Sequence, residues 1–195
     1  IIIVNDCSTD NTKKMLDTLA HEDSIKIVHH SFNSGKGAAI QTAKDYITGD
    51  LVIIQDADLE YDPAEYMSLY NLFLEKNADA VYGSRYSGNQ VMIDTFIHYY
   101  GNKSITFISN IFSNLHLTDM ETCYKMIRSD IFKKINIESN CFGFEPEITA
   151  KLAKMNVRIF EVPIHYEPRI DGKKIGWKDG IKAIWFIIKF NLLRR

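Results

Sequence analysis

The sequence contains few cysteines, and none belongs to a recognisable motif. The three lie far apart, with no CxxC pair and no histidine at the spacing of a zinc site (Cys7, Cys123 and Cys141). This pattern excludes a disulfide framework and a zinc-stabilised fold. It favours a reducing, cytosolic compartment.

Long hydrophobic runs are also missing. The longest extends from 181 to 193 and is interrupted by Lys182, Lys189 and Asn191, whereas a membrane-spanning helix needs about 20 mostly apolar residues. We therefore expect the chain not to cross a membrane. The sequence also has no GxxxxGK[ST] and no GxGxxG segment, which excludes a P-loop and a dinucleotide fingerprint.

What is present is an ordinary globular composition with an uneven charge. The 195 residues are 46% hydrophobic and 25% charged, which suits one domain with its own core. The net charge of −2 gives no attraction to nucleic acid. Residues 169–195, however, hold eight Lys or Arg against two Asp, so they carry +6 and residues 1–168 carry −8. We expect this basic tail to meet an anionic partner.

Apolar, β-branched runs recur roughly every 25 residues, with helical patterns between them. The four runs are Ile1–Val4, Ile25–Val28, Leu51–Ile54 and Ala80–Gly83. This rhythm predicts an α/β fold with a doubly wound, mainly parallel sheet flanked by helices. Because the chain opens directly on a strand and not on Met, we expect further residues upstream.

The rhythm changes after Arg85. The later patterns predict helices over 91–115, 129–135 and 146–155, strands over 122–127 and 157–164, and a last helix from 177 to the end. The last helix carries an apolar stripe beside lysines. It can therefore lie in a lipid interface, or it can pack on the domain or on a second subunit. The aromatic residues of 96–112 have two explanations as well: they form an interface or lipid-facing helix, or they belong to the core. We divide the chain into a domain over 1–176 and a basic amphipathic helix over 177–195.

Polar side chains follow each of the four predicted strands. They include Asp6, Lys36, Asp56 and Arg85. Because ligands of parallel α/β sheets bind beyond the carboxyl ends of the strands, we predict that the functional site lies there.

The segment Asp56-Ala57-Asp58 predicts a divalent-metal site. On an extended backbone, alternation places both carboxylates on one side, where they repel unless a cation lies between them. Glu60 offers a third oxygen ligand, and the lack of histidine favours Mg²⁺ or Mn²⁺ over zinc. The alternative is a solvated acidic turn in which Asp62 caps a helix beginning at Pro63.

The glycines around Lys36 are a weaker signal. Gly35 and Gly37 allow a close backbone approach and an anion at the start of a helix, and a purely structural helix start explains them equally well. Asp6, directly after the first strand, is available for a ribose or base contact.

Seven segments, taken in order, resemble the family 2 glycosyltransferases with the GT-A fold, and within them the dolichyl- and polyprenyl-phosphate mannosyl- and glucosyltransferases. The segments are Val4–Thr12, Asn33–Gly37, Asp56–Asp62, Gly83–Arg85, Thr118–Lys125, Gly143–Glu147 and Glu161–Gly180. They cover nearly the whole chain. The family's first strand, with its Pro-x-Tyr-Asn-Glu motif, has no counterpart here, and neither do the transmembrane helices in which this branch often ends.

The resemblance implies roles for individual residues. It assigns catalysis to Asp58, Arg85, Asp119, Glu121, Arg169 and Lys174, nucleotide-sugar binding to Asp6, Asn33, Lys36 and Asp56, and metal binding to Asp56, Asp58 and Glu60. Lys125 also falls where the family lines the sugar and acceptor pocket.

The implied reaction is an inverting, metal-dependent transfer of a hexose from a nucleotide sugar of the GDP-mannose or UDP-glucose type. A polyprenyl or dolichyl phosphate acceptor, at the cytosolic face of a membrane, is ionised at pH 7 and needs no strong base. The basic residues of 169–178 favour this anionic acceptor. A saccharide acceptor, as in cell-surface polysaccharide synthesis, requires a carboxylate base, for which Asp119 or Glu121 is the candidate. A non-catalytic nucleotide-sugar-binding module is the third interpretation, and a homo-oligomer is left open.

Overall fold

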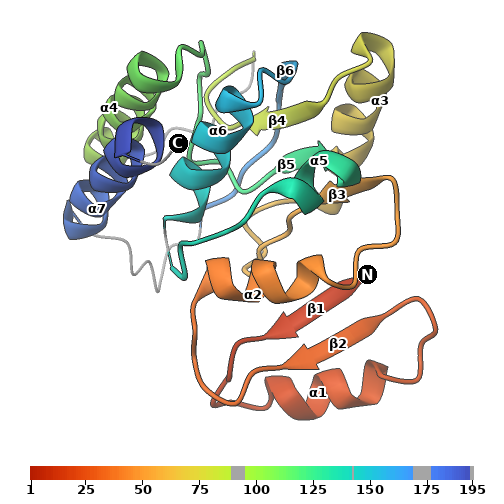
Figure 1. The fold of residues 1–195 in the computed structure, drawn as a ribbon. Helices are drawn as coiled ribbons and strands as arrows, with labels where there is room; N and C mark the ends of the chain where they lie inside the picture. Colours follow the sequence, from red (N-terminus) through yellow and green to blue (C-terminus); the bar gives the residue numbers. More distant parts are fainter. Residues whose placement is uncertain (89–94, 142, 169–176, 194–195) are drawn as a thin grey trace.

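The computed structural model describes residues 1–88, 95–141, 143–168 and 177–193. Strands and helices alternate along them (Figure 1). The strands are β1 (Ile2–Asn5), β2 (Lys26–His29), β3 (Leu51–Ile53), β4 (Ala80–Ser84), β5 (Lys125–Arg128) and β6 (Ile159–Pro163). The helices are α1 (Thr12–Leu19), α2 (Lys36–Lys44), α3 (Tyr66–Lys76), α4 (Phe96–Ser113), α5 (Ser129–Lys134), α6 (Phe144–Lys154) and α7 (Trp177–Ile188), with a 3₁₀ turn over Pro63–Glu65 and a π-helical turn over Lys189–Leu193.

The strands form two sheets. β1 and β2 pair in parallel, and a second sheet has the order β3–β5–β4–β6. In the second sheet, β4 and β6 are parallel, whereas β5 is antiparallel to both of its neighbours. The α/β class is confirmed, and the antiparallel β5 is a difference from the predicted pairing. It arises because α4 and the residues after it return the chain to the end of the sheet at which β4 stops.

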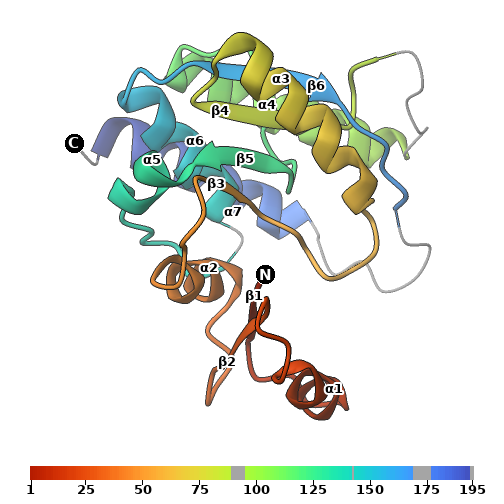
Figure 2. The same cartoon turned by 90° about the vertical axis from the view of Figure 1, so that its right-hand side faces the viewer.

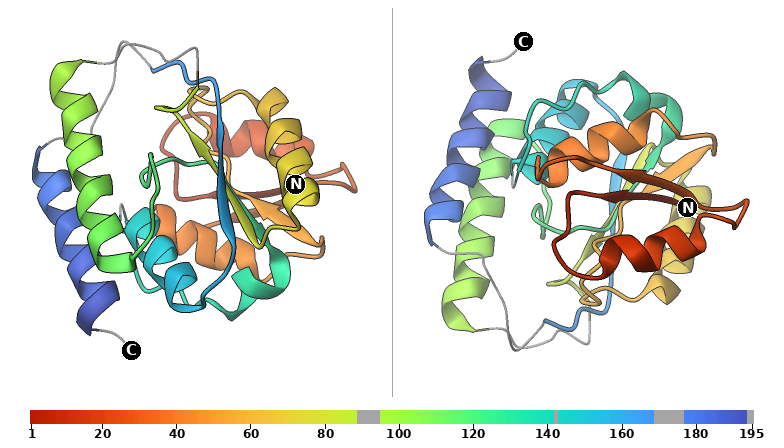
Figure 3. Two further views of the ribbon diagram at one scale, coloured as in Figure 1. Left: turned by 90° about the horizontal axis from the view of Figure 1, so that it is seen from above. Right: turned by 90° about the horizontal axis from the view of Figure 1, so that it is seen from below.

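Helices cover both faces of the four-stranded sheet. Seen from above, β4 and β6 lie between α3 on one side and the pair of α4 and α7 on the other (Figure 3, left). β1, β2 and α1 form a separate lobe, with α2 between that lobe and the second sheet (Figure 2). Asp6 follows a strand of the two-stranded sheet, whereas Asp56 and Arg85 follow strands of the four-stranded sheet. The ends of these strands face the same region of the molecule.

The core lies in the half of the molecule built on β4, β5 and α6. Tyr82, Ile127, Ile148 and Leu152 are fully buried. The lobe of β1, β2 and α1 contributes little to the core, since no residue of α1 is buried.

The predicted elements are found with small shifts. The helix predicted over 91–115 is α4, and residues 91–94 of that prediction lie outside the described residues. The strand predicted over 122–127 begins only at Lys125. Within the described residues, no helix is both long and apolar enough to span a bilayer.

Candidate functional site

Asp6, which follows β1, holds the loop that leads into α2. Its carboxylate accepts hydrogen bonds from the backbone N–H of Ser34 (2.8 Å) and Gly35 (2.6 Å) and contacts Nδ1 of His30 (2.7 Å). Burial opposes ionisation, but these hydrogen bonds outweigh it and lower the pKa of Asp6. Asn33 adds a side-chain hydrogen bond to the backbone oxygen of Asp6 (3.3 Å). Asp6 and Asn33, the two predicted nucleotide-binding residues here, therefore order the loop that carries Lys36.

The glycines on either side of Lys36 allow another loop to approach α2. The amides of Gly37 and Ala38 both donate to the carbonyl oxygen of Asn140 (2.8 and 3.3 Å). A Cβ on Gly37 would collide with the carbonyl oxygen of Ser139. These amides are thus satisfied within the protein, which favours the structural explanation of the two glycines over an anion site at the helix start.

Lys36 joins the loop after β3 to the start of α6. Its Nζ lies 2.8 Å from Oδ2 of Asp56 and 2.7 Å from Oε1 of Glu145. Burial works against the charged amine, but the carboxylates of Glu145 and Asp56 outweigh it and raise the pKa of Lys36 well above its ordinary value. The Lys36 ammonium is therefore a fixed positive charge beside Asp56. The sequence analysis missed Glu145 as a partner, although its Gly143–Glu147 segment was noted.

The acidic segment after β3 turns at once. β3 ends at Ile53, and Leu59 adopts a left-handed conformation with φ of 62°. Ala57 and Asp58 form a turn, so the extended backbone assumed for this segment is absent, and the placement of both carboxylates on one side stays a prediction. Oδ1 of Asp58 accepts the backbone N–H of Glu60 (3.2 Å).

Glu60 is buried and faces another loop. Its Oε2 accepts a hydrogen bond from the hydroxyl of Tyr166 (2.9 Å), and its carbonyl oxygen accepts the N–H of Glu167 (3.0 Å). Tyr166 is a residue that the sequence analysis did not select. It ties the acidic segment to the chain that follows β6 and leads toward residue 169.

The described residues contain no group of three His, Cys, Asp or Glu side chains arranged to hold a metal ion. The donor chemistry nevertheless fits Mg²⁺ or Mn²⁺, because Asp56 and Asp58 supply hard oxygen ligands and such ions commonly complete their shell with substrate phosphates. Metal binding by Asp56, Asp58 and Glu60 therefore stays a prediction.

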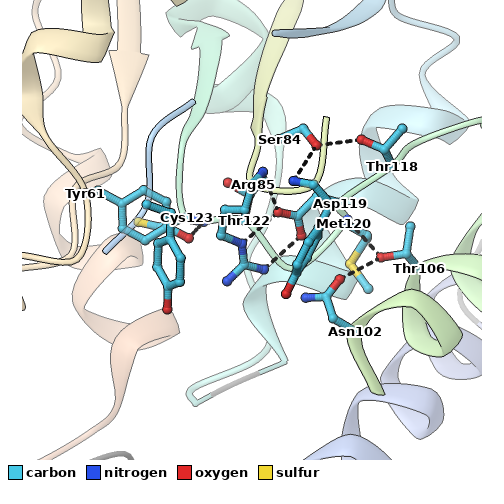
Figure 4. A network of polar contacts seen from close by, with 12 residues as sticks. Tyr61, Ser84, Arg85, Asn102, Thr106, Thr118, Asp119, Met120, Thr122 and Cys123 are labelled. Carbon is cyan, nitrogen blue, oxygen red and sulfur yellow. Dashed lines mark hydrogen bonds and ion pairs between the residues drawn. The ribbon is translucent and has the colours of Figure 1, made fainter. Parts of the chain in front are cut away.

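Arg85, directly after β4, forms a two-point ion pair with Asp119 (Figure 4). Its Nε lies 2.7 Å from Oδ2 and its Nη2 lies 2.8 Å from Oδ1, while its backbone N–H also donates to Oδ2 (3.1 Å). Asp119 is completely buried. Burial opposes its ionisation, but the Arg85 guanidinium outweighs that effect and lowers the pKa of Asp119. This carboxylate is a counter-ion, and its low basicity argues against a role as general base.

The loop that carries Asp119 is held by its neighbours. The hydroxyls of Ser84 and Thr118 lie 2.6 Å apart, and the Glu161 carboxylate accepts the backbone N–H groups of Thr118 (2.8 Å) and Asp119 (3.2 Å). The Arg85 guanidinium also lies 5.1 Å from the ring centre of Tyr166. Arg85 is thus oriented by groups from three different segments.

Glu121, which is partly buried, and Lys125, which is fully buried, are a second pair of titratable groups at the site. Burial, followed by the charge of Glu145, raises the pKa of Glu121 to about 8. Burial lowers the pKa of Lys125, whose ammonium donates to the carbonyl oxygens of Met120 and Thr122. No described residue hydrogen-bonds to Oε1 of Glu121. Of the two carboxylates proposed as a base, Glu121 alone has a pKa suited to taking up a proton near neutral pH.

The structure thus gathers most of the predicted residues. Lys36 contacts Asp56 directly, Arg85 contacts Asp119 directly, and Tyr166 lies between Glu60 and Arg85. Arg169 and Lys174 lie outside the described residues.

The chain resembles known proteins along most of its length. It is 30% identical over 186 residues to the undecaprenyl-phosphate mannosyltransferase of Micrococcus luteus, covering 87% of this chain and 72% of that protein. It is 28% identical to the dolichyl-phosphate beta-glucosyltransferase ALG5A of Trichomonas vaginalis, covering all of this chain and 62% of that protein. A third relative is the low-salt glycan biosynthesis hexosyltransferase Agl6 of Haloferax volcanii, with 25% identity and coverage of 96% of this chain and 45% of that protein.

The fold agrees with these relatives. The crystal structure of glucosyl-3-phosphoglycerate synthase from Mycobacterium tuberculosis, in complex with Mn²⁺ and UDP-glucose, superposes with a TM-score of 0.72 at 13% identity, over 97% of this chain and 67% of that one. This likeness supports the GT-A-like α/β fold. The model of the family described as glycosyl transferase family 2 matches residues 1–136. The chain therefore belongs to glycosyl transferase family 2.

Proposed function

We propose that this chain is the catalytic part of a metal-dependent, inverting glycosyltransferase that moves a hexose from a nucleotide sugar to a polyprenyl or dolichyl phosphate. The observation that carries the proposal is the pair of contacts Lys36–Asp56 and Arg85–Asp119, which puts two fixed cations and their carboxylates at the ends of β3 and β4. The relatives named as undecaprenyl- and dolichyl-phosphate transferases support the lipid-phosphate acceptor.

The chemistry of the donor requires positive charge. Cleavage of the sugar–phosphate bond leaves a nucleoside diphosphate whose charge grows in the transition state. A bound Mg²⁺ or Mn²⁺, held by Asp56 and Asp58 with Glu60 beside them, supplies Lewis-acid neutralisation of that charge. Lys36 fixes the position of Asp56, and the Arg85 guanidinium, held by Asp119, adds an oriented cation. The manganese and UDP-glucose bound by the mycobacterial synthase support this choice of metal and donor.

The acceptor decides whether a base is needed. A phosphate monoester is ionised at neutral pH, so its oxygen attacks without prior deprotonation. In this scheme Arg169 and Lys174 bind the acceptor phosphate. We infer that the protein works peripherally at the cytosolic face of a membrane, with the helix over 177–195 in contact with lipid.

A saccharide acceptor is the second candidate. It is favoured by Glu121, whose pKa is raised to about 8 by burial and which could accept the proton of a sugar hydroxyl. The name of Agl6, a glycan biosynthesis hexosyltransferase, is compatible with such an acceptor. A non-catalytic nucleotide-sugar-binding module is the third candidate.

The decisive experiment supplies labelled GDP-mannose or UDP-glucose, Mg²⁺ or Mn²⁺, and a short polyprenyl phosphate in detergent, and measures label that passes into organic solvent. We expect transfer from one donor that EDTA abolishes and that Asp58→Ala loses, while Asp45→Asn on an exposed turn retains it. Donor binding without transfer to the lipid, followed by transfer to a free sugar hydroxyl, would select the saccharide acceptor. Donor binding without any transfer would select the binding module.

A further inference from the structure

The helix α4 has polar side chains on its inner side and apolar side chains on its outer side. Thr106 and Ser109 are buried, with 2% and 1% of their surface exposed, whereas Phe107 and Ile111 are 65% and 61% exposed. The aromatic residues of 96–112 therefore lie largely outside the core. The polar inner side faces the loop that carries Asp119, because the hydroxyl oxygen of Thr106 accepts the N–H of Met120 (3.1 Å).

Lys103 belongs to this inner side and was not selected from the sequence. Its Nζ donates to the carbonyl oxygen of Thr118 (3.0 Å), the residue before Asp119. The side chain is half-buried. Figure 4 shows Asn102, its neighbour in the chain, beside the Arg85–Asp119 pair. Lys103 is thus a cation of α4 at the edge of that pair.

Lys103 and Arg85 lie against the same aromatic ring. Nζ of Lys103 is 5.1 Å from the ring centre of Tyr86, and Cζ of Arg85 is 5.5 Å from the same centre. The ring of Tyr99 lies 5.8 Å from the Lys103 ammonium. Aromatic faces attract a cation but carry no net charge. Two positive charges are therefore held close together around Tyr86.

The carboxylates of this region are already engaged by other groups. Asp119 accepts two hydrogen bonds from the Arg85 guanidinium, and Glu161 accepts the backbone N–H groups of Thr118 and Asp119. Among the residues that the structure describes, no carboxylate forms an ion pair with Lys103. The charge of Lys103 is therefore left without a counter-ion in the described part of the chain.

The inner side of α4 also has hydrogen-bond donors to spare. An ammonium group has three N–H donors, and Thr118 is the one acceptor of Lys103 among the described residues. The Oδ1 atom of Asn102 accepts the hydroxyl of Thr106 (3.3 Å), whereas its Nδ2 donates to no described residue. Ammonium and amide donors beside an oriented guanidinium are groups that bind phosphate oxygens.

We propose that Lys103, with the amide of Asn102 beside it, binds the phosphate of the acceptor together with Arg85. The inference rests on the proposed function and adds to it residues of α4 that hold the acceptor. A phosphate monoester carries about two negative charges at neutral pH, and Asp119 already compensates Arg85. A second cation without a counter-ion supplies the missing positive charge.

The position of Lys103 favours the acceptor over the diphosphate of the donor. The Arg85 guanidinium contacts two rings, and Tyr166 connects it to Glu60 of the acidic segment, where the metal and donor are predicted. Tyr86 connects the same guanidinium to Lys103. Lys103 therefore adjoins Arg85 through a different ring from the one that leads to the predicted metal site.

The test measures binding of farnesyl phosphate to the 195-residue chain in detergent, and separately binding of the donor nucleotide with Mn²⁺, by calorimetric titration. The test variant is K103Q, whose amide can still donate to Thr118, so its thermal unfolding should match that of the parent chain. The matched control is K44Q at the end of α2, because Lys44 also donates to a backbone carbonyl oxygen, that of Ile135.

We expect K103Q to weaken binding of farnesyl phosphate about tenfold, the loss that follows from one charge-assisted hydrogen bond. Binding of the donor nucleotide should stay unchanged, and K44Q should alter neither affinity. K103R keeps the charge and should restore most of the binding. Farnesol, which lacks the phosphate, should bind equally to K103Q and the parent chain.

Two results would overturn the proposal. Equal affinity of K103Q and the parent chain for farnesyl phosphate would exclude Lys103 from the acceptor site. Weaker binding of the donor nucleotide by K103Q, with farnesyl phosphate unaffected, would assign Lys103 to the diphosphate of the donor.

Sugar transfer separates this inference from the proposed function. K103Q should raise KM for the acceptor phosphate and leave KM for the donor unchanged. Transfer to farnesyl phosphate with the same KM in K103Q and the parent chain would reject the inference and leave the proposed function standing. Binding of farnesyl phosphate that depends on Lys103, in a protein that transfers no sugar to it, would confirm the phosphate site and reject the proposed function.

Discussion

The guanidinium of Arg85 donates one hydrogen bond to each carboxylate oxygen of Asp119, at 2.7 and 2.8 Å, and the carboxylate is completely buried. The pair joins the end of β4 to the loop before β5, two segments 34 residues apart in the chain. Its geometry is bidentate, which fixes the plane of the guanidinium as well as its position. The site therefore contains an arginine that is oriented before any substrate arrives.

Asp119→Asn should destabilise the protein and abolish its activity. The amide leaves the largely buried Arg85 without its counter-ion, and breaking a buried pair in this way costs about 3–5 kcal/mol. Urea unfolding followed by circular dichroism measures the loss. Asp130→Asn, which removes the exposed partner of Arg128, is the control and should leave the unfolding midpoint unchanged. Equal midpoints for Asp119→Asn and the parent chain would contradict the structural role of the pair.

Lys36→Gln should weaken binding of the nucleotide sugar at least tenfold. The substitution removes the cation shared by Asp56 and Glu145, while the hydrogen bond from the Gly35 N–H to Asp6 stays in place. Calorimetric titration with the donor nucleotide, with and without Mn²⁺, measures the change. Lys13→Gln on α1 deletes an exposed ion pair with Asp17 and serves as the matched control. Unaltered affinity in Lys36→Gln would exclude Lys36 from the donor site.

The stability of the protein should fall as Glu121 ionises. Burial raises the folded-state pKa of Glu121 to about 8, whereas an unfolded chain ionises glutamate near pH 4.3. The folded state therefore binds the proton more tightly, and this contribution is complete at low pH and is lost as the pH rises toward 8. The Glu121→Gln side chain stays neutral throughout. The melting temperature of this variant should therefore rise relative to that of the parent chain between pH 5.5 and pH 9. Each kcal/mol corresponds to roughly 2–4 °C in a domain of this size.

The two curves should run together near pH 4, where this glutamate is largely protonated in both states, and should move apart steadily as the pH rises toward 8. Parallel curves over the whole range would mean that Glu121 is ionised in the folded state. The same variant informs the mechanism. Normal transfer to a lipid phosphate by Glu121→Gln would show that no base is needed there, and loss of transfer to a sugar hydroxyl would identify Glu121 as the base.

Gly37→Ala should destabilise the protein, whereas Gly101→Ala should stabilise it. A Cβ on Gly37 would collide with the Ser139 carbonyl oxygen and push apart α2 and the loop before α6, at a cost of about 1–3 kcal/mol. A Cβ on Gly101, inside α4, meets no atom within 4 Å, and alanine is favoured over glycine within helices by about 0.5–1 kcal/mol. Thermal unfolding distinguishes the two. Equal effects would contradict the close approach of Ser139 to α2.

Much of the fold could be predicted because apolar runs and helical periodicity are local properties. The first four strands were found within a residue or two, and the polar residues after them do mark the candidate site. The antiparallel β5 was not predicted, since pairing direction depends on how the intervening chain returns to the sheet. The pairing of the Asp56 and Asp58 carboxylates was predicted from an extended backbone, whereas Ala57 and Asp58 form a turn in the structure.

The sequence by itself determined the α/β class, the family and the residue types available for chemistry, because these follow from periodicity and from short motifs in order. Only the tertiary structure decided which charges meet. Lys36 binds Asp56 and Glu145, which is 109 positions further along the chain, and Tyr166 reaches Glu60 across 106 positions. It also decided that α4 turns its apolar residues outward. Such pairings depend on long-range packing, which places buried charges only where a partner compensates their lost hydration.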